Sequence, residues 1–327
     1  MTKDDVLAIL INSDGYISGE TISSRIGVTR AAVNGAVKAL KTDGCIITSV
    51  TNRGYKLEYC PDKLFAGEVY SYLDEQRRSS IICVASTDST NNMLKEMLKD
   101  SPVSGTCIIA NEQTGGRGRM GRTFISPPDT GIYMSMILRP EGSFTDMSEI
   151  TAWTAVAVHN AILNAYGINT DIKWVNDLFL GGKKTTGILT ELSIEGEIGV
   201  VSNVIVGIGI NVNQSRESFP EELRDIATSL SAGSGTAKLN RARLSAEVIK
   251  ELDRMMTLWP QGKEQYLETY RNCCLTIGKD VDVINYSTGV SRPGRALDVN
   301  PDFSLKVIFE DGHTEDVRSG EVSVRRR

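Results

Sequence analysis

The sequence has only two histidines, His159 and His313, in 327 residues. With so few, a Ser-His-Asp or Cys-His mechanism is not expected. His159 falls in an apolar helical segment, where we predict that it packs in the helix rather than acting as a base. The six cysteines lack C-x-x-C spacing, so a cysteine–histidine metal site is not expected. We expect most of these thiols to be small core residues in a reducing cytoplasm.

Long apolar runs are also missing. None reaches the length that spans a membrane, and the first residues carry aspartates where a secretory signal has bases. We therefore expect a cytoplasmic protein with no membrane partner. The net charge of −5 and the charged fraction of 24% are ordinary for a soluble globular protein. A chain of this length predicts two or three domains.

One loop stands out from this acidic background. The segment Thr114–Arg122 sets three arginines among four glycines. Glycine lets backbone N–H groups approach a ligand closely, and arginine adds a fixed positive charge. This glycine–arginine loop therefore predicts a site for a polyanion such as the phosphates of a nucleotide. The alternative is an exposed turn that is merely basic.

Two familiar nucleotide motifs are excluded. The spacing of Gly116, Gly118 and Gly121 fits G-x-G-x-x-G, which has meaning only between a strand and a helix. Pro127-Pro128 forbid a helix after the loop, and the apolar run Ile132–Leu138 predicts a buried strand. A dinucleotide-binding fold is therefore rejected. Gly182–Thr185 lacks the upstream glycine of a phosphate-binding P-loop.

Residues 1–62 are predicted to form a winged helix-turn-helix domain. Ser18 and Thr29 can cap two short helices separated by a glycine turn, and a hairpin around Asn52–Gly54 would form the wing. The second of these helices has one apolar face and one polar face that could reach base edges and phosphates. The predicted DNA contacts are Thr29, Arg30, Asn34, Lys38 and Arg53. The alternative is a winged helix that contacts only proteins.

The rest of the chain predicts two further domains. Residues 63–275 alternate strands and helices joined by short turns, which indicates an α+β domain with a mixed, largely antiparallel sheet. Residues 276–327 contain four short strands separated by glycine and proline, which indicates a small β-barrel. Arg325–Arg327 are predicted to be a solvated basic tail. Strands around Thr186–Leu192 and Gly199–Asn211 could pair edge to edge across a two-fold axis.

Six motifs in this order give the chain a resemblance to a known family: Asp88–Asn91, Gly116–Gly121, Lys173–Asp177, Lys184–Leu189, Gly207–Asn211 and Ser319–Ser323. The chain resembles, over essentially its whole length, the bifunctional biotin protein ligase and biotin operon repressor family. The resemblance implies an N-terminal winged helix, a central mixed-sheet biotin/lipoate ligase-like domain and a C-terminal small SH3-like barrel.

The sequence departs from the usual family pattern at four positions. Val175 replaces a proline, Phe124 stands where tryptophan is frequent, and Gly35 and Ala36 stand where many members carry lysine or histidine. The first two replacements are conservative in shape. The last two fall in the predicted recognition helix and bear on DNA contacts rather than on catalysis.

The resemblance implies a reaction in two steps. Biotin and ATP give biotinyl-5′-adenylate and pyrophosphate, and a lysine of a biotin carboxyl carrier protein then attacks the mixed anhydride. Lys184 would bridge the biotin carboxylate and the α-phosphate, and Asp177 would orient the incoming lysine and accept its proton or hold Mg²⁺. Arg117 and Arg119 would hold phosphate as their loop orders over the intermediate, and Arg122 would position pyrophosphate. Neighbouring Lys183 is expected to be a surface lysine.

The resemblance also assigns the binding residues. Those assigned to biotin are Ser89, Thr90, Asn91, Gln113, Arg117, Gly118, Arg119 and Lys184. Those assigned to ATP and the adenylate are Arg117, Arg119, Arg122, Asn176, Lys184 and Asn211. Catalysis is assigned to Lys184, Arg119 and Asp177, and Mg²⁺ is expected to bind through the substrate phosphates with Asp177 as the candidate protein ligand. The apolar strand Ile132–Leu138 would form the floor under the biotin ring.

Several alternatives remain open from the residues alone. Ser89 and Thr90 could simply cap a helix, and Asn176-Asp177 could be a turn-forming pair. The enzyme could transfer lipoate or octanoate instead of biotin, or the chain could be a transcription factor whose central domain only senses a ligand. A single winged helix would bind DNA weakly, so a homodimer on two half-sites of operator DNA is expected.

Overall fold

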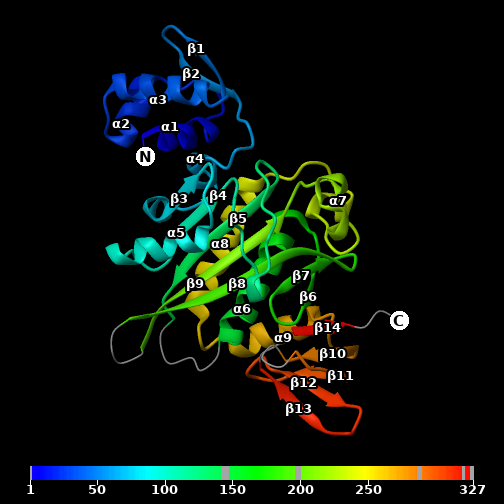
Figure 1. Cartoon of the computed structure of the whole chain (residues 1–327). Coiled ribbons are helices and arrows are strands. Elements are labelled where there is room, and N and C mark those ends of the chain that lie inside the picture. Colours follow the sequence, from blue (N-terminus) through cyan, green and yellow to red (C-terminus); the bar gives the residue numbers. More distant parts are fainter. Residues whose placement is uncertain (1, 141–146, 196–199, 286–288, 319–320, 325–327) are drawn as a thin grey trace.

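The structure, a computed structural model, describes residues 2–140, 147–195, 200–285, 289–318 and 321–324. A small helical part lies at one end, a helix-covered sheet in the middle and a second small sheet at the other end (Figure 1). The fold is therefore α+β, as predicted. The domain boundaries at 62/63 and 275/276 stay predictions.

The N-terminal part has the predicted order of a winged helix-turn-helix. It contains α1 (Thr2–Ile11), α2 (Gly19–Ile26), α3 (Arg30–Thr42), β1 (Ile46–Val50) and β2 (Gly54–Tyr59). The Ser18 hydroxyl accepts the Thr21 N–H at 3.0 Å, and the Thr29 hydroxyl accepts the Ala32 N–H at 3.2 Å. Both predicted caps are therefore confirmed, and they fix where α2 and α3 begin.

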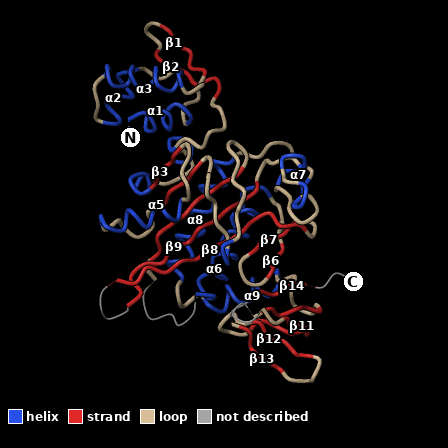
Figure 2. The backbone as a smooth tube through the Cα atoms, in the orientation of Figure 1, coloured by secondary structure: helices blue, strands red, loops and turns tan. Residues whose placement is uncertain are grey.

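The middle of the molecule is built on one seven-stranded sheet. Its strands, in spatial order, are β3 (Ile81–Val84), β4 (Cys107–Ala110), β5 (Gly131–Leu138), β9 (Val200–Asn211), β8 (Lys183–Glu195), β7 (Asp177–Leu180) and β6 (Asp171–Lys173). Only β3 and β4 run parallel, so the sheet is mixed and largely antiparallel, as predicted. Figure 2 shows these strands crossing the centre of the molecule.

The two faces of the sheet are covered unequally. The helices α6 (Met147–Tyr166), α8 (Arg241–Leu258) and α9 (Lys263–Cys273) share one large core with the sheet. The short helix α5 (Thr90–Met97) packs against β4, β5 and β9 through a separate small core on the opposite face. Because a helix of only eight residues covers little of that face, part of it stays open beside α5.

Shorter elements complete the middle part. They are α4 (Ala66–Tyr70), α7 (Leu230–Ser234) and the 3-10 turns η1 (Glu75–Ser80), η2 (Leu98–Asp100), η3 (Arg119–Gly121), η4 (Arg216–Ser218) and η5 (Glu221–Leu223). The glycine–arginine loop contains only the three-residue turn η3 and leads into β5. No helix follows the loop before β5 begins, which confirms that the dinucleotide-binding fold was rightly excluded.

His159 is a packed residue of α6, as predicted. Its side chain is buried, with Nδ1 3.0 Å from the Thr170 hydroxyl and Nε2 3.5 Å from the Cys273 sulfur. Burial lowers the pKa of His159 below its ordinary value, so the ring is neutral at physiological pH. The buried His159 ring therefore helps to hold α6 in place, and it does not lie on the face of the sheet that is left open beside α5.

The C-terminal sheet has five antiparallel strands, one more than the sequence predicted. They are β10 (Asp280–Ile284), β11 (Ser291–Val299), β12 (Leu305–Phe309), β13 (Thr314–Val317) and β14 (Glu321–Val324), in the spatial order β13-β12-β11-β10-β14. Sequence reasoning missed β13 because its residues are mostly polar. The predicted tail Arg325–Arg327 lies outside the described residues.

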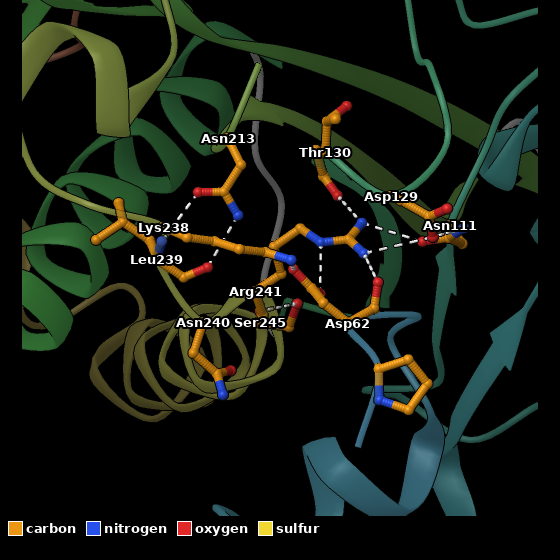
Figure 3. A network of polar contacts seen from close by, with 12 residues as sticks. Asp62, Asn111, Asp129, Thr130, Asn213, Lys238, Leu239, Asn240, Arg241 and Ser245 are labelled. Atoms are coloured by element: carbon orange, nitrogen blue, oxygen red, sulfur yellow. Dashed lines mark hydrogen bonds and ion pairs between the residues drawn. The ribbon is translucent and has the colours of Figure 1, made fainter. Parts of the chain in front are cut away.

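A fully buried arginine joins the winged helix to the middle part (Figure 3). Arg241, at the start of α8, is 0% exposed, and its Nε donates to Asp62 Oδ1 at 2.8 Å. The same guanidinium donates to the carbonyl of Gly131 at 2.9 Å and to Asn111 Oδ1 at 3.0 Å. Asp62 lies in the segment that links β2 to α4. The contact therefore fixes this link to the ends of β4 and β5.

We expect Arg241→Met to lower the free energy of unfolding by about 3–5 kcal/mol, because it leaves the Asp62 carboxylate and the Gly131 carbonyl without their buried donor. Lys238 provides a matched control, since its ammonium lies 3.3 Å from the other Asp62 oxygen but is 65% exposed. Lys238→Met should cost less than about 1 kcal/mol. Urea denaturation of both variants measures the difference. Equal losses would show that Arg241 is not the structural tie.

Among the described helices, none has both the length and the apolar character that crossing a membrane requires.

Candidate active site

A cavity of about 1060 Å³, open solvent included, lies on the open side of the sheet beside α5. It is enclosed by the glycine–arginine loop, the start of α5, the turn between β6 and β7, and the middle of β8 and β9. Its lining contains five cations and one carboxylate: Arg117, Arg119, Arg122, Lys173 and Lys184 against Asp177. The cavity is thus strongly positive in an acidic protein, which suits a polyanionic ligand.

The glycine–arginine loop folds back on itself as a narrow ribbon over this cavity. The Phe124 N–H donates to the Gly116 carbonyl at 2.9 Å, and the Gly118 N–H donates to the Arg122 carbonyl at 2.7 Å. Arg119 Nη1 donates to Asn176 Oδ1 at 3.1 Å, which ties the loop to the turn across the cavity. Arg117 also donates to Asn92 Oδ1, so side chains of the loop contact both α5 and the turn between β6 and β7.

Glycines in β9 form part of the cavity floor, and their lack of a side chain leaves room for the residues that pack against it. A Cβ at Gly207 would overlap the Asn91 side-chain oxygen, and a Cβ at Gly209 would overlap the Phe124 ring. Ile208 and Ile210 alternate with them and are buried on the opposite face. Sequence reasoning did not assign these glycines a role, although glycine at every second strand position is a signal of close approach.

Lys184 is held rigidly near the start of β8. Its N–H donates to the Ile226 carbonyl, and its own carbonyl accepts the Thr228 N–H, both at 2.9 Å. Its ammonium lies 2.6 Å from Asp177 Oδ1, with side chains 35% and 20% exposed. Two predicted catalytic residues therefore meet at the edge of the glycine floor.

Lys183 points elsewhere. Its ammonium donates to the Arg224 carbonyl at 2.9 Å, and the residue is half-buried rather than at an open surface. It is not among the residues that line the cavity. The two adjacent lysines thus have separate environments, because successive side chains of a strand point to opposite sides.

The C-terminal sheet fixes the segment that carries Asp177. The Trp174 indole N–H donates to the Phe303 carbonyl at 2.9 Å, and the Trp174 backbone N–H donates to the Thr276 hydroxyl at 3.1 Å. Asn176 Nδ2 donates to the Ile188 carbonyl at 2.9 Å and to Asp177 Oδ1 at 3.1 Å. Because Asn176 Oδ1 also accepts the hydrogen bond from Arg119, both the oxygen and the nitrogen of the Asn176 amide are hydrogen-bonded. Asn176 and Asp177 therefore form part of the cavity wall and are not merely a turn-forming pair.

Four of the residues predicted to bind biotin gather at the start of α5. Ser89 occupies the cap position of α5 but makes no side-chain capping bond. The helix is capped instead by Gln113, whose Oε1 accepts the Thr90 N–H at 2.9 Å. The capping alternative for Ser89 is thus not realised. Ser89, Thr90, Asn91 and Gln113 all line the cavity.

The structure does not bring every predicted residue to the cavity. Asn211 is not in the lining and accepts a hydrogen bond from Gln214 at 3.3 Å at the end of β9. Sequence reasoning missed several lining residues: Thr123, Lys173, Trp174, Gly187, Gly207 and Gly209. From the predicted apolar floor strand, only Met134 reaches the lining. The described residues contain no cluster of three potential metal ligands.

The predicted DNA-binding face of the winged helix is exposed. Thr29, Arg30, Asn34 and Lys38 all lie on the exposed side of α3 or at its start. Ala36 is buried with Val33, Val37 and Leu40, so only Gly35 of the two unusual positions faces outward. Arg53, in the wing, lies over the Tyr16 ring with 4.4 Å between the guanidinium carbon and the ring centroid.

Comparisons with known proteins agree with this arrangement. Residues 83–211 match the Biotin/lipoate A/B protein ligase family, and residues 2–56 match an HTH domain. The chain is 41% identical to the bifunctional ligase/repressor BirA of Bacillus spizizenii over 72% of this chain and 71% of that protein. It is 29% identical to the bifunctional ligase/repressor BirA of Escherichia coli over 98% of this chain and 96% of that protein.

Solved structures agree as well. The biotin protein ligase from Aquifex aeolicus in complex with biotin and ATP superposes with a TM-score of 0.65 at 30% identity. The match covers 76% of this chain and 99% of the Aquifex protein.

Proposed function

The chain belongs to the family of bifunctional ligase/repressors, and we propose that it activates biotin with ATP, transfers it to a lysine of a carrier protein and represses transcription in response to biotin. The observation that carries the ligase activity is Lys184, held 2.6 Å from Asp177 at the edge of a glycine floor beneath a loop of arginines. A protein that only sensed a ligand would not need this concentration of cations.

In the first step an oxygen of the biotin carboxylate attacks the α-phosphorus of ATP, and pyrophosphate leaves. Attack of an anion on an anion is slow unless fixed positive charge offsets the repulsion. We assign this task to the Lys184 ammonium between the two groups, with Arg117 and Arg119 on the phosphate and Arg122 on the departing pyrophosphate.

Mg²⁺ fits this site in its usual mode, held by substrate phosphates and a single carboxylate. Asp177 is the one carboxylate of the lining and would be its protein ligand. The ion would neutralise charge on the phosphates.

In the second step the neutral amine of the carrier lysine attacks the carbonyl carbon of the mixed anhydride, and AMP leaves. Asp177 can orient this amine and accept its proton, because it is the one carboxylate of the lining, and Asn176 donates a hydrogen bond to its Oδ1. Asn176 thereby positions the carboxylate. It also holds the loop through Arg119.

The polar groups at the start of α5 favour biotin over lipoate. Thr90, Asn91 and Gln113 offer hydroxyl and amide groups inside the cavity, which match the N–H and C=O groups of a ureido ring. The dithiolane ring of lipoate has no such groups and would leave them unpaired. This supports biotin as the substrate.

The direct test incubates the protein with biotin, radiolabelled ATP and Mg²⁺ and looks for labelled biotinyl-adenylate, with lipoate and octanoate in parallel. We expect adenylate with biotin alone. Mass spectrometry of the acylated carrier then identifies the transferred group. Adenylate formation only with lipoate or octanoate would overturn the substrate assignment, and no adenylate with any acid would support the ligand sensor.

Arg119→Gly should make the enzyme release its intermediate. The variant loses the hydrogen bond from the loop to Asn176, so the loop no longer closes over biotinyl-adenylate. Free adenylate acylates any lysine, so we expect biotin on serum albumin added as a bystander. An Arg119→Gly enzyme that is simply inactive, or that labels only the carrier, would argue against this closing role.

For the repressor we propose a homodimer formed through β8. Strand β7 pairs with β8 only up to Gly187, so within the described chain no strand covers the outer edge of β8 from Leu189 to Glu195. Strand β9 does not offer such an edge, because β5 and β8 flank it from Val204 to Asn211. The expectation of a free edge on β9 was therefore wrong over that range, and Gly199 lies outside the described residues.

The remaining assignments follow from this function. We propose the domains as residues 1–62 for DNA binding, 63–275 for catalysis and 276–327 as a small SH3-like barrel closed around the five C-terminal strands. An enzyme that consumes ATP and binds operator DNA works in the cytoplasm. Its partners would be the biotin carboxyl carrier protein and the operator of biotin genes.

A further inference from the structure

A continuous line of hydrogen bonds runs from Thr90, which lines the cavity, to a carboxylate that is not part of the lining. The Thr90 hydroxyl lies 2.6 Å from the Ser135 hydroxyl, which lies 2.5 Å from Asn91 Oδ1. Asn91 Nδ2 donates to Glu191 Oε2 at 2.6 Å. Thr90, Ser135 and Asn91 are 3%, 0% and 4% exposed, so they have little access to water.

The carboxylate sets the direction of every bond in this line. A carboxylate only accepts, so Asn91 must turn its NH₂ toward Glu191 and its oxygen toward Ser135. Ser135 has one hydroxyl proton and must give it to Asn91. The Thr90 hydroxyl must then give its own single proton to Ser135.

Thr90 is left with lone pairs only. Its other contact, 3.1 Å to Gln113 Oε1, cannot also receive the proton, and that oxygen already accepts the Thr90 N–H at 2.9 Å. Thr90 lines the cavity, and its hydroxyl can act there only as an acceptor.

We propose that Glu191 is a specificity-determining residue, which acts through Asn91 and Ser135 to make Thr90 an acceptor and so selects a ligand ring that presents an N–H there. This inference rests on the proposed function, because it takes biotin to be the ligand of the cavity. A ring with an oxygen at the same position would set two acceptors against each other and lose a hydrogen bond.

The surroundings keep Glu191 in its charged form. Lys95 donates to Glu191 Oε1 at 2.7 Å, and the Arg117 guanidinium lies 3.9 Å from the other oxygen. Burial raises the pKa of Glu191, but the hydrogen bonds from Lys95 and Asn91 outweigh it, so the pKa lies below its ordinary value. Gly207 leaves the room for the Asn91 amide that this line requires.

The test uses biotin and its two cyclic carbamate analogues, in each of which a ring oxygen replaces one ureido N–H. Calorimetric titration of the full-length protein without ATP gives the three dissociation constants. In the wild-type protein we expect one carbamate, the one that sets its oxygen against Thr90, to bind at least about tenfold more weakly than the other. Biotin should bind at least as well as the better carbamate.

In Glu191→Gln the line can reverse, because the new amide can donate to Asn91 Oδ1. Asn91 can then donate to Ser135, and Ser135 to Thr90, which frees the Thr90 proton for the cavity. We expect the difference between the two carbamates to shrink to within about threefold. Ser135→Ala should also reduce the difference between the two carbamates, because it removes the acceptor of the Thr90 hydroxyl proton. The two variants are separate tests, so one remains if the other fails to fold.

Lys95→Met is the matched control. It removes the ammonium beside Glu191, and in titrations at a pH well above the ordinary pKa of a glutamate the carboxylate remains an acceptor, so the discrimination between carbamates should stay as in the wild-type protein. Equal binding of the carbamates by the wild-type protein, or undiminished discrimination in folded Glu191→Gln or Ser135→Ala, would overturn the inference. Failure of the wild-type protein to bind biotin would instead overturn the proposed substrate.

Discussion

Lys184→Ala should lower the rate of biotinyl-adenylate synthesis by about 10²–10³-fold, which corresponds to the loss of about 3–4 kcal/mol of transition-state stabilisation. The ammonium is the cation that we place where the carboxylate meets the α-phosphate, and the alanine side chain supplies no charge. The Lys184 backbone bonds to Ile226 and Thr228 do not depend on its side chain, so the fold should remain intact. Initial rates with labelled ATP give the result, and circular dichroism checks the fold.

Lys183→Ala provides the paired control on the adjacent residue. Its side chain contacts the Arg224 carbonyl outside the cavity, so adenylate synthesis should be close to that of the wild-type protein. A folded Lys184→Ala variant that makes adenylate at a near-normal rate would remove Lys184 from the mechanism. An equal loss in both variants would point to damage of β8 rather than of catalysis.

Biotin together with ATP should tighten operator binding by about 5- to 150-fold, the range typical of coupling between two sites. Only a dimer places two winged helices on two half-sites, and a loop ordered by the adenylate would favour the dimer. Whatever stabilises the dimer tightens the operator complex by the same free energy. The carrier protein should weaken it, because it consumes the adenylate and competes for the same face. A mobility-shift titration on biotin operator DNA, with and without both substrates, measures the change.

Thr190→Pro separates dimer formation from catalysis. The Ile188 N–H points away from β9 toward the Asn176 carbonyl at 3.0 Å, so the Thr190 N–H two residues on points to the same outer side. Proline there removes a donor of the free edge but none that pairs with β9. We expect Thr190→Pro to retain ligase activity and to lose the ligand-dependent part of DNA binding.

Equal operator affinity of the wild-type protein with and without substrates would show that the winged helix is not a biotin-responsive repressor. Retained ligand dependence in Thr190→Pro would move the dimer interface away from β8. Neither outcome would affect the ligase assignment, because the cavity lies within one chain.

The sequence by itself determined the local structure. Ser18 and Thr29 fixed the starts of α2 and α3 because a cap acts on N–H groups only a few residues away. Pro127-Pro128 excluded a helix after the glycine–arginine loop for an equally local reason. The order of six short motifs was enough to indicate the family, which the comparisons then confirmed.

Where reasoning from the sequence failed, the deciding contacts were distant. β13 was missed because its polar residues are stable as a strand only beside β12. β9 was expected to offer a free edge, but β5 and β8 flank it from Val204 to Asn211. Asn211 shares a motif with Gly207 and Gly209 yet falls beyond the cavity lining, because β9 carries it past the edge of the floor.

The chemistry of the site was decided by the tertiary structure. Asn91 in α5 and Glu191 in β8 are 100 residues apart, and Ser135 joins their line from β5. No local pattern links these residues, since each reads as an ordinary helix or strand position. Only the tertiary structure brings β5, β8 and β9 together in one sheet. Because the residues of the hydrogen-bonded line are buried, no water can replace a lost partner, and the direction of each hydrogen bond therefore matters.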